Sequence, residues 1–229
     1  MPPFMFNLEL LLFVAPAIIL GIVAQFMVKS AYAQTGRIAA RTSGYAAARH
    51  MLDAAGLRNV EIEQIPGTLS DHYDPRQKVL RLSQDVYHGR SLAAVGIAAH
   101  EAGHALQDAR GYVPLMIRNA AVPAASFGSS AGMILVLLGF ALVSQFMLLL
   151  GIVLFSGVVF FQLVNLPVEF NASARAKAQL VELGIIDQAE LPYVRKVLNA
   201  AALTYVAATL QSLLTLLYYV LQFMNRRED

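Results

Sequence analysis

The residues best suited to chemistry lie at positions 100–104, where two histidines flank a glutamate in the pattern HExxH. Residues four apart lie on one face of a helix, so His100 and His104 can bind one metal ion. Glu101 can then take a proton from a water that the ion activates and pass it to a leaving amine. This chemistry is peptide-bond hydrolysis with Zn2+ as the cofactor. The plainer interpretation is a helix with two solvated histidines.

A hydrolytic zinc site needs a third protein ligand from elsewhere in the chain. Glu169 is the candidate, because it directly follows the third of four long apolar runs and opens a predicted helix. A glutamate there can instead stabilise the helix N-terminus through the helix dipole, and the residues alone favour neither interpretation. Asp71, His72 and Asp74 in a predicted turn are weaker alternative ligands.

The elements that must position these residues are unusually apolar. Of the 229 residues, 57% are hydrophobic and 14% are charged, against about 45–50% and about 25% in ordinary soluble domains. Four runs are each long enough to cross a hydrocarbon layer of about 30 Å as a helix. We therefore predict an α-helical membrane protein with about four transmembrane helices. The runs are residues 10–28, 120–143, 146–166 and 200–224.

Composition excludes several other classes. The chain has no cysteine, so a metal site must use histidine, aspartate or glutamate. A net charge of +2 without a basic run argues against nucleic acid as a partner. The first apolar run is longer than the core of a signal peptide and no basic residue precedes it, so we predict a retained anchor.

The distribution of charge predicts the orientation in the membrane. Lysine and arginine lie in the polar segments 29–119 and 168–198, apart from Arg226 and Arg227. The positive-inside rule places both segments in the cytoplasm. The predicted parts are an N-terminal anchor at 1–28, a catalytic lobe at 29–119, two transmembrane helices at 120–167, a helix with the third ligand at 168–198, and a fourth transmembrane helix with a short tail at 199–229.

The polar lobe is predicted to mix helices and strands. Ser43 is a candidate N-cap, glycines follow the helix ends, and alternating apolar residues indicate the strands. If the second strand has a free edge, an extended substrate can pair along it. Helices are expected at 43–55, from Ser91 through the HExxH motif, and at 168–183 after Pro167; strands at 60–65 and 78–82; and a turn at 66–75.

Within the apolar runs, small and polar residues indicate helix packing. No run carries an ionisable residue near its middle, which argues against a transporter. Close helix contacts are expected at Gly128, Gly132 and Gly139 and at the polar residues Gln145, Gln162, Asn165 and Gln211.

Beyond the motif, the chain resembles the neutral zinc metallopeptidases of bacterial membranes (YugP-like proteases). The resemblance rests on the motif and on residues 66–75 (PGTLSDHYDP), 79–83 (VLRLS), 166–173 (LPVEFNAS) and 198–206 (LNAAALTYV). The arrangement is also similar to heat-shock-type and CAAX prenyl-type membrane proteases. In those, the third zinc ligand is a glutamate on a helix beyond membrane spans.

The resemblance implies a small α+β zincin-like lobe in which His100, His104 and Glu169 bind zinc. It implies an enzyme of the bacterial plasma membrane that cleaves membrane or membrane-proximal polypeptides at or near the cytoplasmic membrane face. The alternative is a membrane scaffold that keeps a structural zinc site. Glu101 argues against this alternative, because a structural site has no use for a carboxylate beside an open coordination position.

Two further expectations concern residues around the metal, the first from the resemblance and the second from residue type. Related proteases often place an aspartate at the position of Ser173, and we expect one in close relatives at Asn171. Orientation of the imidazoles is therefore expected from Asn171, Asp108 or a backbone carbonyl. Donors to the oxyanion are expected among His72, Tyr73, Tyr87 and His88. His72 is preferred as a catalytic residue because it lies in the shared turn, although such a residue can simply bond to its own backbone.

Overall fold

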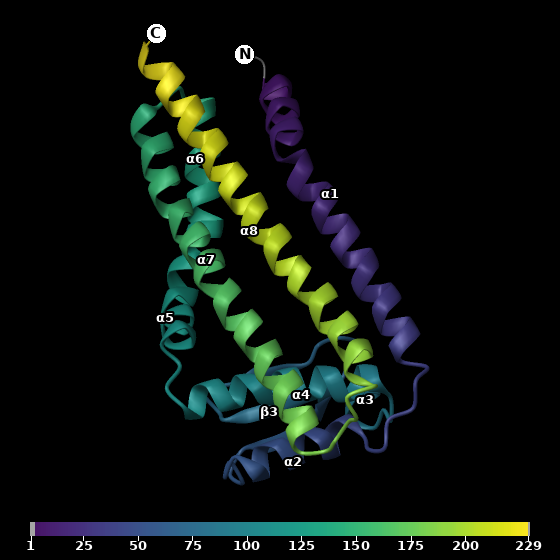
Figure 1. Ribbon diagram of the computed structural model, residues 1–229. Coiled ribbons are helices and arrows are strands. Elements are labelled where there is room, and N and C mark those ends of the chain that lie inside the picture. Colours follow the sequence, from purple (N-terminus) through teal and green to yellow (C-terminus); the bar gives the residue numbers. More distant parts are fainter. Residues whose placement is uncertain (1–2, 229) are drawn as a thin grey trace. The chain divides into compact units, whose positions relative to one another are not determined.

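The computed structural model describes residues 3–228, and the side chains of residues 8–226 among them. The described chain is mainly helical and contains one small mixed sheet (Figure 1). In chain order, the elements are α1 (Pro3–Thr35), α2 (Gly44–Ala54), β1 (Glu61–Ile65), β2 (His72–Asp74), β3 (Val79–Ser83), α3 (Gln84–Tyr87), α4 (Leu92–Ala109), α5 (Val113–Phe127), the π-helical turn η1 (Gly128–Gly132), α6 (Met133–Ala141), α7 (Gln145–Glu182) and α8 (Leu191–Glu228).

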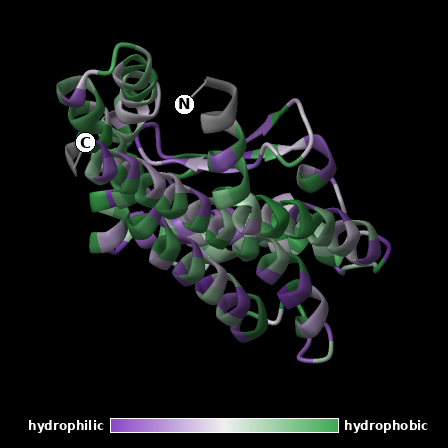
Figure 2. Ribbon diagram, turned by 90° about the horizontal axis from the view of Figure 1, so that it is seen from above, coloured by the Kyte–Doolittle hydropathy of each residue, from purple (hydrophilic) through white to green (hydrophobic). Residues whose placement is uncertain are grey.

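Four helical stretches have the length and apolar composition needed to cross a membrane. Figure 2 shows many helical residues in the hydrophobic colour, with hydrophilic residues among them. The predicted fold class, a helical membrane protein with four spans and a small α+β part, is confirmed. The stretches are Leu8–Thr35, Val113–Ala141, Gln145–Glu182 and Leu191–Arg226.

The chain divides into two compact units. We call the first the helical unit; it comprises Met1–Val23, Met116–Pro167 and Leu203–Asp229. The second, the mixed unit, comprises Ala24–Leu115 and Val168–Ala202. The HExxH motif and Glu169 both belong to the mixed unit, so the candidate site can be described within one compact body.

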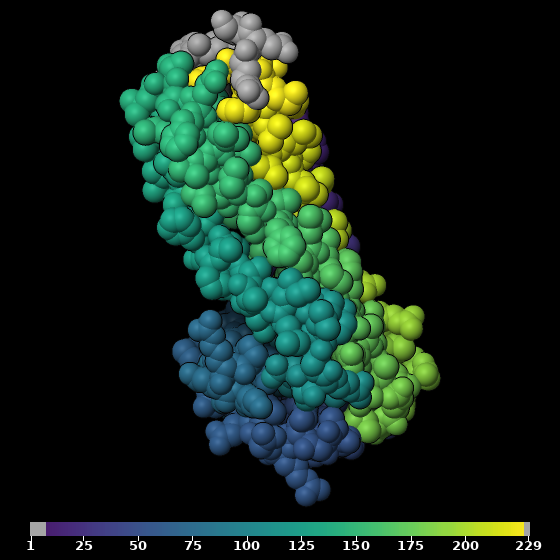
Figure 3. Space-filling model, turned by 90° about the vertical axis from the view of Figure 1, so that its left-hand side faces the viewer, coloured from purple at the N-terminus to yellow at the C-terminus, as the bar shows by residue number. Residues whose placement is uncertain are grey.

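Glycines allow helices of the helical unit to pack closely. A Cβ at Gly128 would lie 2.2 Å from the carbonyl oxygen of Leu154, and one at Gly139 would lie 2.6 Å from the backbone nitrogen of Leu148. Only glycine permits this approach. The predicted packing function of these glycines is confirmed. In the space-filling view, the surfaces of α7 and the C-terminal part of α8 meet directly (Figure 3).

Polar residues also join these helices, as predicted for two of the four. Gln145 Nε2 donates to the carbonyl oxygen of Arg226 at 2.9 Å, and Asn165 Oδ1 accepts from Arg118 Nε at 3.1 Å. For Gln162 and Gln211, the hydrogen bonds that the structure shows are accepted by their own backbone carbonyls, from the hydroxyls of Thr209 and Thr215. These bonds satisfy polar groups that would be costly to leave unpaired in an apolar layer.

The sheet of the mixed unit has the order β1-β3-β2, so β3 is its central strand. β1 runs parallel to β3 and β2 runs antiparallel to it. The hypothesis that a substrate pairs along β3 is therefore wrong, because both edges of that strand are occupied. β2 was predicted as part of a turn. Its three residues form a strand only through their pairing with β3, which local turn propensity does not reveal.

Helices in the mixed unit begin and end near the predicted residues. Ser43 Oγ accepts from the backbone N–H of Ala46 at 3.3 Å, and Ser91 Oγ accepts from that of Ala94 at 3.2 Å. Gly56 and Gly184 follow their helices with φ of +77° and +65°, a conformation that glycine adopts without strain.

Pro167 does not end a helix, contrary to expectation. α7 runs without a break from Gln145 to Glu182, so the third span and the ligand-bearing segment are one helix. A proline removes one backbone hydrogen bond, but long apolar helices tolerate this loss when neighbouring groups compensate. Glu169 therefore lies inside a helix, and its interpretation as a residue that stabilises a helix N-terminus is wrong.

Candidate metal centre

α4 places the two motif histidines on one face. The ring centroids of His100 and His104 are 4.8 Å apart, and the ring planes are nearly perpendicular at 85°. His104 is buried, with 7% of its surface exposed, and His100 is partly buried. The spacing of four therefore brings both imidazoles to one point, as helix geometry requires.

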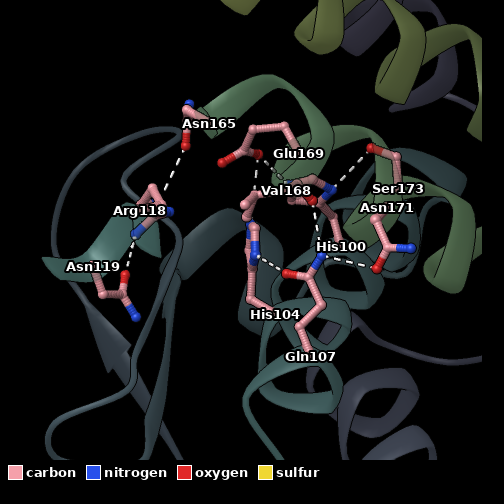
Figure 4. Close-up of polar contacts among 10 residues, drawn as sticks. All are labelled: His100, His104, Gln107, Arg118, Asn119, Asn165, Val168, Glu169, Asn171 and Ser173. Atoms are coloured by element: carbon pink, nitrogen blue, oxygen red, sulfur yellow. Dashed lines mark hydrogen bonds and ion pairs between the residues drawn. The ribbon is translucent and has the colours of Figure 1, made fainter. Parts of the chain in front are cut away.

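α7 brings the third candidate ligand to the same point. Glu169 Oε2 lies 3.1 Å from His100 Nε2 and 3.5 Å from His104 Nε2. Figure 4 shows the carboxylate in contact with both rings. The ligand atoms of these three residues all lie within 4.8 Å of one another. Glu169 is 3% exposed, so this carboxylate is shielded from solvent.

A close approach of α4 and α7 makes this arrangement possible. A Cβ at Gly103 would lie 2.7 Å from the carbonyl oxygen of Ala172, and Ala172 is fully buried. Gly103 lies inside the HExxH motif, and Ala172 lies three residues after Glu169 on the same helix face. The small residue between the two histidines therefore lets the helix that carries Glu169 approach the imidazoles.

The three side chains fit a zinc ion. Ligand atoms about 2.0–2.2 Å from a tetrahedral zinc ion lie about 3.3–3.6 Å from each other. The distances from Glu169 Oε2 to the two Nε2 atoms, 3.1 and 3.5 Å, are close to this range. Two imidazole nitrogens and one carboxylate oxygen are also a donor set that zinc uses in hydrolases. Zinc is therefore the expected metal.

Each imidazole has a hydrogen-bond partner at its other nitrogen. His100 Nδ1 lies 3.1 Å from Ser173 Oγ, and His104 Nδ1 lies 2.9 Å from Gln107 Oε1. The expectation that orientation must come from a residue other than Ser173 is wrong, because the serine hydroxyl itself contacts His100. Asn171 acts only through Gln107, whose Nε2 donates to Asn171 Oδ1 at 3.0 Å.

Burial raises the pKa of the Glu101 carboxyl above its usual range. Protonated forms of His100 and His104 oppose this shift, while the negative charges of Glu169 and Asp71 add to it. For His104, burial disfavours the charged form, but the hydrogen bond with Glu169 reverses the effect and the pKa is raised. Glu101 is therefore a carboxyl group that can hold or release a proton beside the histidines.

The other candidate ligands are engaged elsewhere. Asp71 Oδ1 accepts from the backbone N–H of Ser83 at 2.8 Å, and Asp74 pairs with Arg81 at 3.1 Å. His72 is exposed, and its Nδ1 lies 2.9 Å from the carbonyl oxygen of Ser70. Among the described residues, the metal-ligand cluster contains His100, His104 and Glu169, and His72 is not part of it.

The expected oxyanion donors have other contacts as well. The Tyr73 hydroxyl donates to Asp108 Oδ2 at 2.9 Å, which ties β2 to α4. The Nδ1 atoms of the two imidazoles contact Ser173 and Gln107 instead of Asp108. The Tyr87 ring packs 4.8 Å from that of Tyr45. His88 Nε2 lies 2.8 Å from Gln64 Oε1. A role for His72 or these residues in catalysis stays a prediction.

Gln107 was not predicted as part of the site. It is fully buried and contacts His104 from one turn further along α4. The signal that could have found it is its spacing, because a residue three after a ligand lies on the same helix face.

The structure thus shows long apolar helices and a buried cluster of two histidines and one glutamate. Comparison with known proteins identifies the family to which the chain belongs. Residues 10–224 match the family described as "putative neutral zinc metallopeptidase", and the chain belongs to it. A curated relative is the protein described as "putative membrane protease YugP" of Bacillus subtilis (strain 168). It is 49% identical over 208 residues, which cover 90% of this chain and 92% of the relative. No solved structure gives a significant match.

Proposed function

We propose that this chain is a zinc metalloendopeptidase that cleaves polypeptides at or near the cytoplasmic face of a bacterial plasma membrane. The observation that carries the proposal is the convergence of His100, His104 and Glu169 within 4.8 Å in a chain of a zinc metallopeptidase family. Structural zinc sites use four protein ligands, whereas catalytic sites use three and keep one open position. Among the described residues, this cluster has three.

Each residue of the site has a separate role. His100, His104 and Glu169 hold zinc, and Ser173 and Gln107 keep the two imidazoles in place. When bound, zinc supplies Lewis acidity that activates water and polarises a carbonyl group. Glu101 takes the proton of the attacking water and delivers it to the leaving amine nitrogen.

We assign the binding of an extended substrate to the outer edge of β2. Within the described residues β2 pairs with β3 only, and Tyr73 in its middle is anchored to Asp108 of α4 by the 2.9 Å hydrogen bond. An extended peptide that pairs with the outer edge of β2 lies beside the helix that carries the motif. This assignment replaces the overturned hypothesis of an edge at β3.

The reaction is assigned to the cytoplasmic side of the membrane. Fifteen of the 17 lysine and arginine residues lie in segments 29–119 and 168–198, and Arg226 and Arg227 account for the other two. Such a bias follows the positive-inside rule. The substrates are therefore membrane proteins or proteins close to the cytoplasmic face.

Hydrolysis of casein by the purified protein in detergent tests the proposed activity. Glu101→Gln should lower the rate roughly 100- to 10,000-fold, because the amide cannot act as a general base. Glu61→Gln, a change at an exposed glutamate of β1, is the matched control and should keep the wild-type rate. Equal rates for Glu101→Gln and the wild type would show that the activity does not come from this site.

A further inference from the structure

Gln107 is a buried amide with a partner at each polar atom. Its Oε1 lies 2.9 Å from His104 Nδ1, and its Nε2 donates to the carbonyl oxygen of Val168 at 2.8 Å and to Asn171 Oδ1 at 3.0 Å (Figure 4). The side chain is fully buried. A buried amide in this position must match donors to acceptors, because a mismatched pair has no water to relieve it.

Two groups in this network allow only one direction of hydrogen bonding. The Val168 carbonyl can only accept, and the Arg175 guanidinium, whose Nε lies 2.7 Å from Asn171 Oδ1, can only donate. Asn171 must therefore present its oxygen to Arg175 and to Gln107. Gln107 must then present its Nε2 to Asn171 and Val168, which leaves its Oε1 facing His104.

This direction determines the proton position on His104. Because Gln107 Oε1 can only accept, His104 Nδ1 must carry a hydrogen. The lone pair of the neutral ring is then on Nε2, the atom 3.5 Å from Glu169 Oε2. The reversed arrangement would place Gln107 Oε1 against two oxygens, at 2.8 and 3.0 Å.

We infer that Gln107, with its direction set by Arg175 through Asn171 and by the Val168 carbonyl, is the positioning residue that fixes His104 in the tautomer whose Nε2 binds metal. The inference deepens the proposed function and rests on it for the metal. Ser173, the partner of His100, differs in kind, because a hydroxyl rotates and can donate or accept. The fixed tautomer therefore belongs to His104.

Nitrogen NMR of the histidine rings in the metal-free protein reads this tautomer directly. The Glu169 carboxylate itself favours a hydrogen on Nε2, so the measurement uses the full-length Glu169→Ala variant at a pH of about 9, where imidazoles are ordinarily neutral. The expected form of His104 is Nδ1–H. Adding Gln107→Met, which keeps length but removes the acceptor, should shift His104 toward Nε2–H. Adding Ser173→Ala should leave His104 unchanged.

A conservative variant separates hydrogen-bond direction from packing. Asn171→Asp keeps an oxygen that only accepts, so His104 should remain Nδ1–H, whereas Asn171→Leu should release it partly. In the protein with Glu169 intact, Gln107→Met should weaken zinc binding by about 10- to 100-fold in a calorimetric titration.

Three results would overturn the inference. They are an Nε2–H form of His104 while Gln107 is intact, an unchanged tautomer in the Gln107→Met variant, or wild-type zinc affinity in that variant. The first needs no Gln107 variant, so a Gln107→Met protein that does not fold would not prevent the test. If the wild type binds no zinc while His104 is Nδ1–H, the proposed function fails and the assignment of the tautomer stands.

Discussion

At the metal centre, Ser173 provides a neutral partner for His100 where a carboxylate would be expected. Its hydroxyl lies 3.1 Å from His100 Nδ1 and is buried, with the residue 5% exposed. A serine orients the ring but adds no negative charge, so it raises the basicity of the imidazole less than an aspartate does. The hydrogen bond with Ser173 thus mainly fixes the orientation of the His100 ring and changes its basicity little.

Removing this hydroxyl should weaken the metal site without abolishing it. We expect Ser173→Ala to raise the Kd for zinc by about tenfold, because the His100 ring loses the hydrogen-bond partner of its Nδ1 atom. Ser156→Ala, at an exposed serine of the same helix, is the matched control and should leave the Kd unchanged. A Kd for Ser173→Ala equal to the wild-type value would show that the contact does not support the ligand.

The site residues differ in how far sequence could predict them. The spacing of His100 and His104 is sufficient, because an α-helix converts four residues into one turn. Glu169 has no spacing rule relative to them and was selected through the family resemblance. The contacts of Ser173 and Gln107 depend on how closely α7 approaches α4, which is a tertiary property. His72 illustrates the limit, since residue type alone could not tell that it lies outside the ligand cluster.

Among the secondary-structure elements, the approach of α7 to α4 at Gly103 determines whether the site forms. Any side chain at this position would meet the carbonyl oxygen of Ala172 at 2.7 Å. Backbone cannot yield as a flexible side chain can, so a larger residue must separate the two helices. Glu169 would then move away from the imidazoles together with α7.

We therefore expect Gly103→Ala to destabilise the protein and to weaken zinc binding. Alanine gains about 1 kcal/mol in helix propensity, but overpacking against backbone costs about 1–3 kcal/mol. Gly157→Ala is the matched control in a helix, because its Cβ would lie an ordinary 3.5 Å from the carbonyl oxygen of Ala124. Thermal unfolding and zinc titration of both variants check this. If Gly103→Ala had the same stability and the same zinc affinity as Gly157→Ala, the close approach of α7 to α4 would be contradicted.

Helices and strands could be predicted from the sequence where the residues that determine them are close together in the chain. Ser43 caps its helix as predicted and a helix begins at Ser91 as predicted, because an N-cap hydrogen bond involves only residues three apart. The prediction that a helix ends at Pro167 was wrong, because the free-energy cost of a proline inside a helix depends on the surroundings of the helix as well as on the proline. The central position of β3 could not be foreseen, because β2 becomes a strand only by pairing with it.

For the whole molecule, the absence of cysteine offers a direct way to determine orientation. Val143 is exposed between α6 and α7, and Thr68 is exposed between β1 and β2. The proposed cytoplasmic orientation places these two positions on opposite sides of the membrane, because one span separates Val143 from the segment that holds Thr68.

Single cysteines at these positions should report that orientation. With a membrane-impermeant maleimide, we expect Val143→Cys to be labelled in intact spheroplasts and Thr68→Cys to be labelled only after permeabilisation. The cysteine-free parent chain is the control for background labelling. The opposite pattern would place the metal centre outside the cytoplasm and would remove the basis for cytoplasmic substrates.

Counting zinc in the purified full-length protein tests the metal centre most directly, with Glu169→Ala measured beside the wild type. Glu182→Ala, at an exposed glutamate near the end of the same helix, is the matched control. We predict about one zinc ion per chain in the wild type and in Glu182→Ala, and a large loss in Glu169→Ala, because two imidazoles alone hold zinc weakly. Full zinc occupancy in Glu169→Ala, or none in the wild type, would contradict a site built from His100, His104 and Glu169.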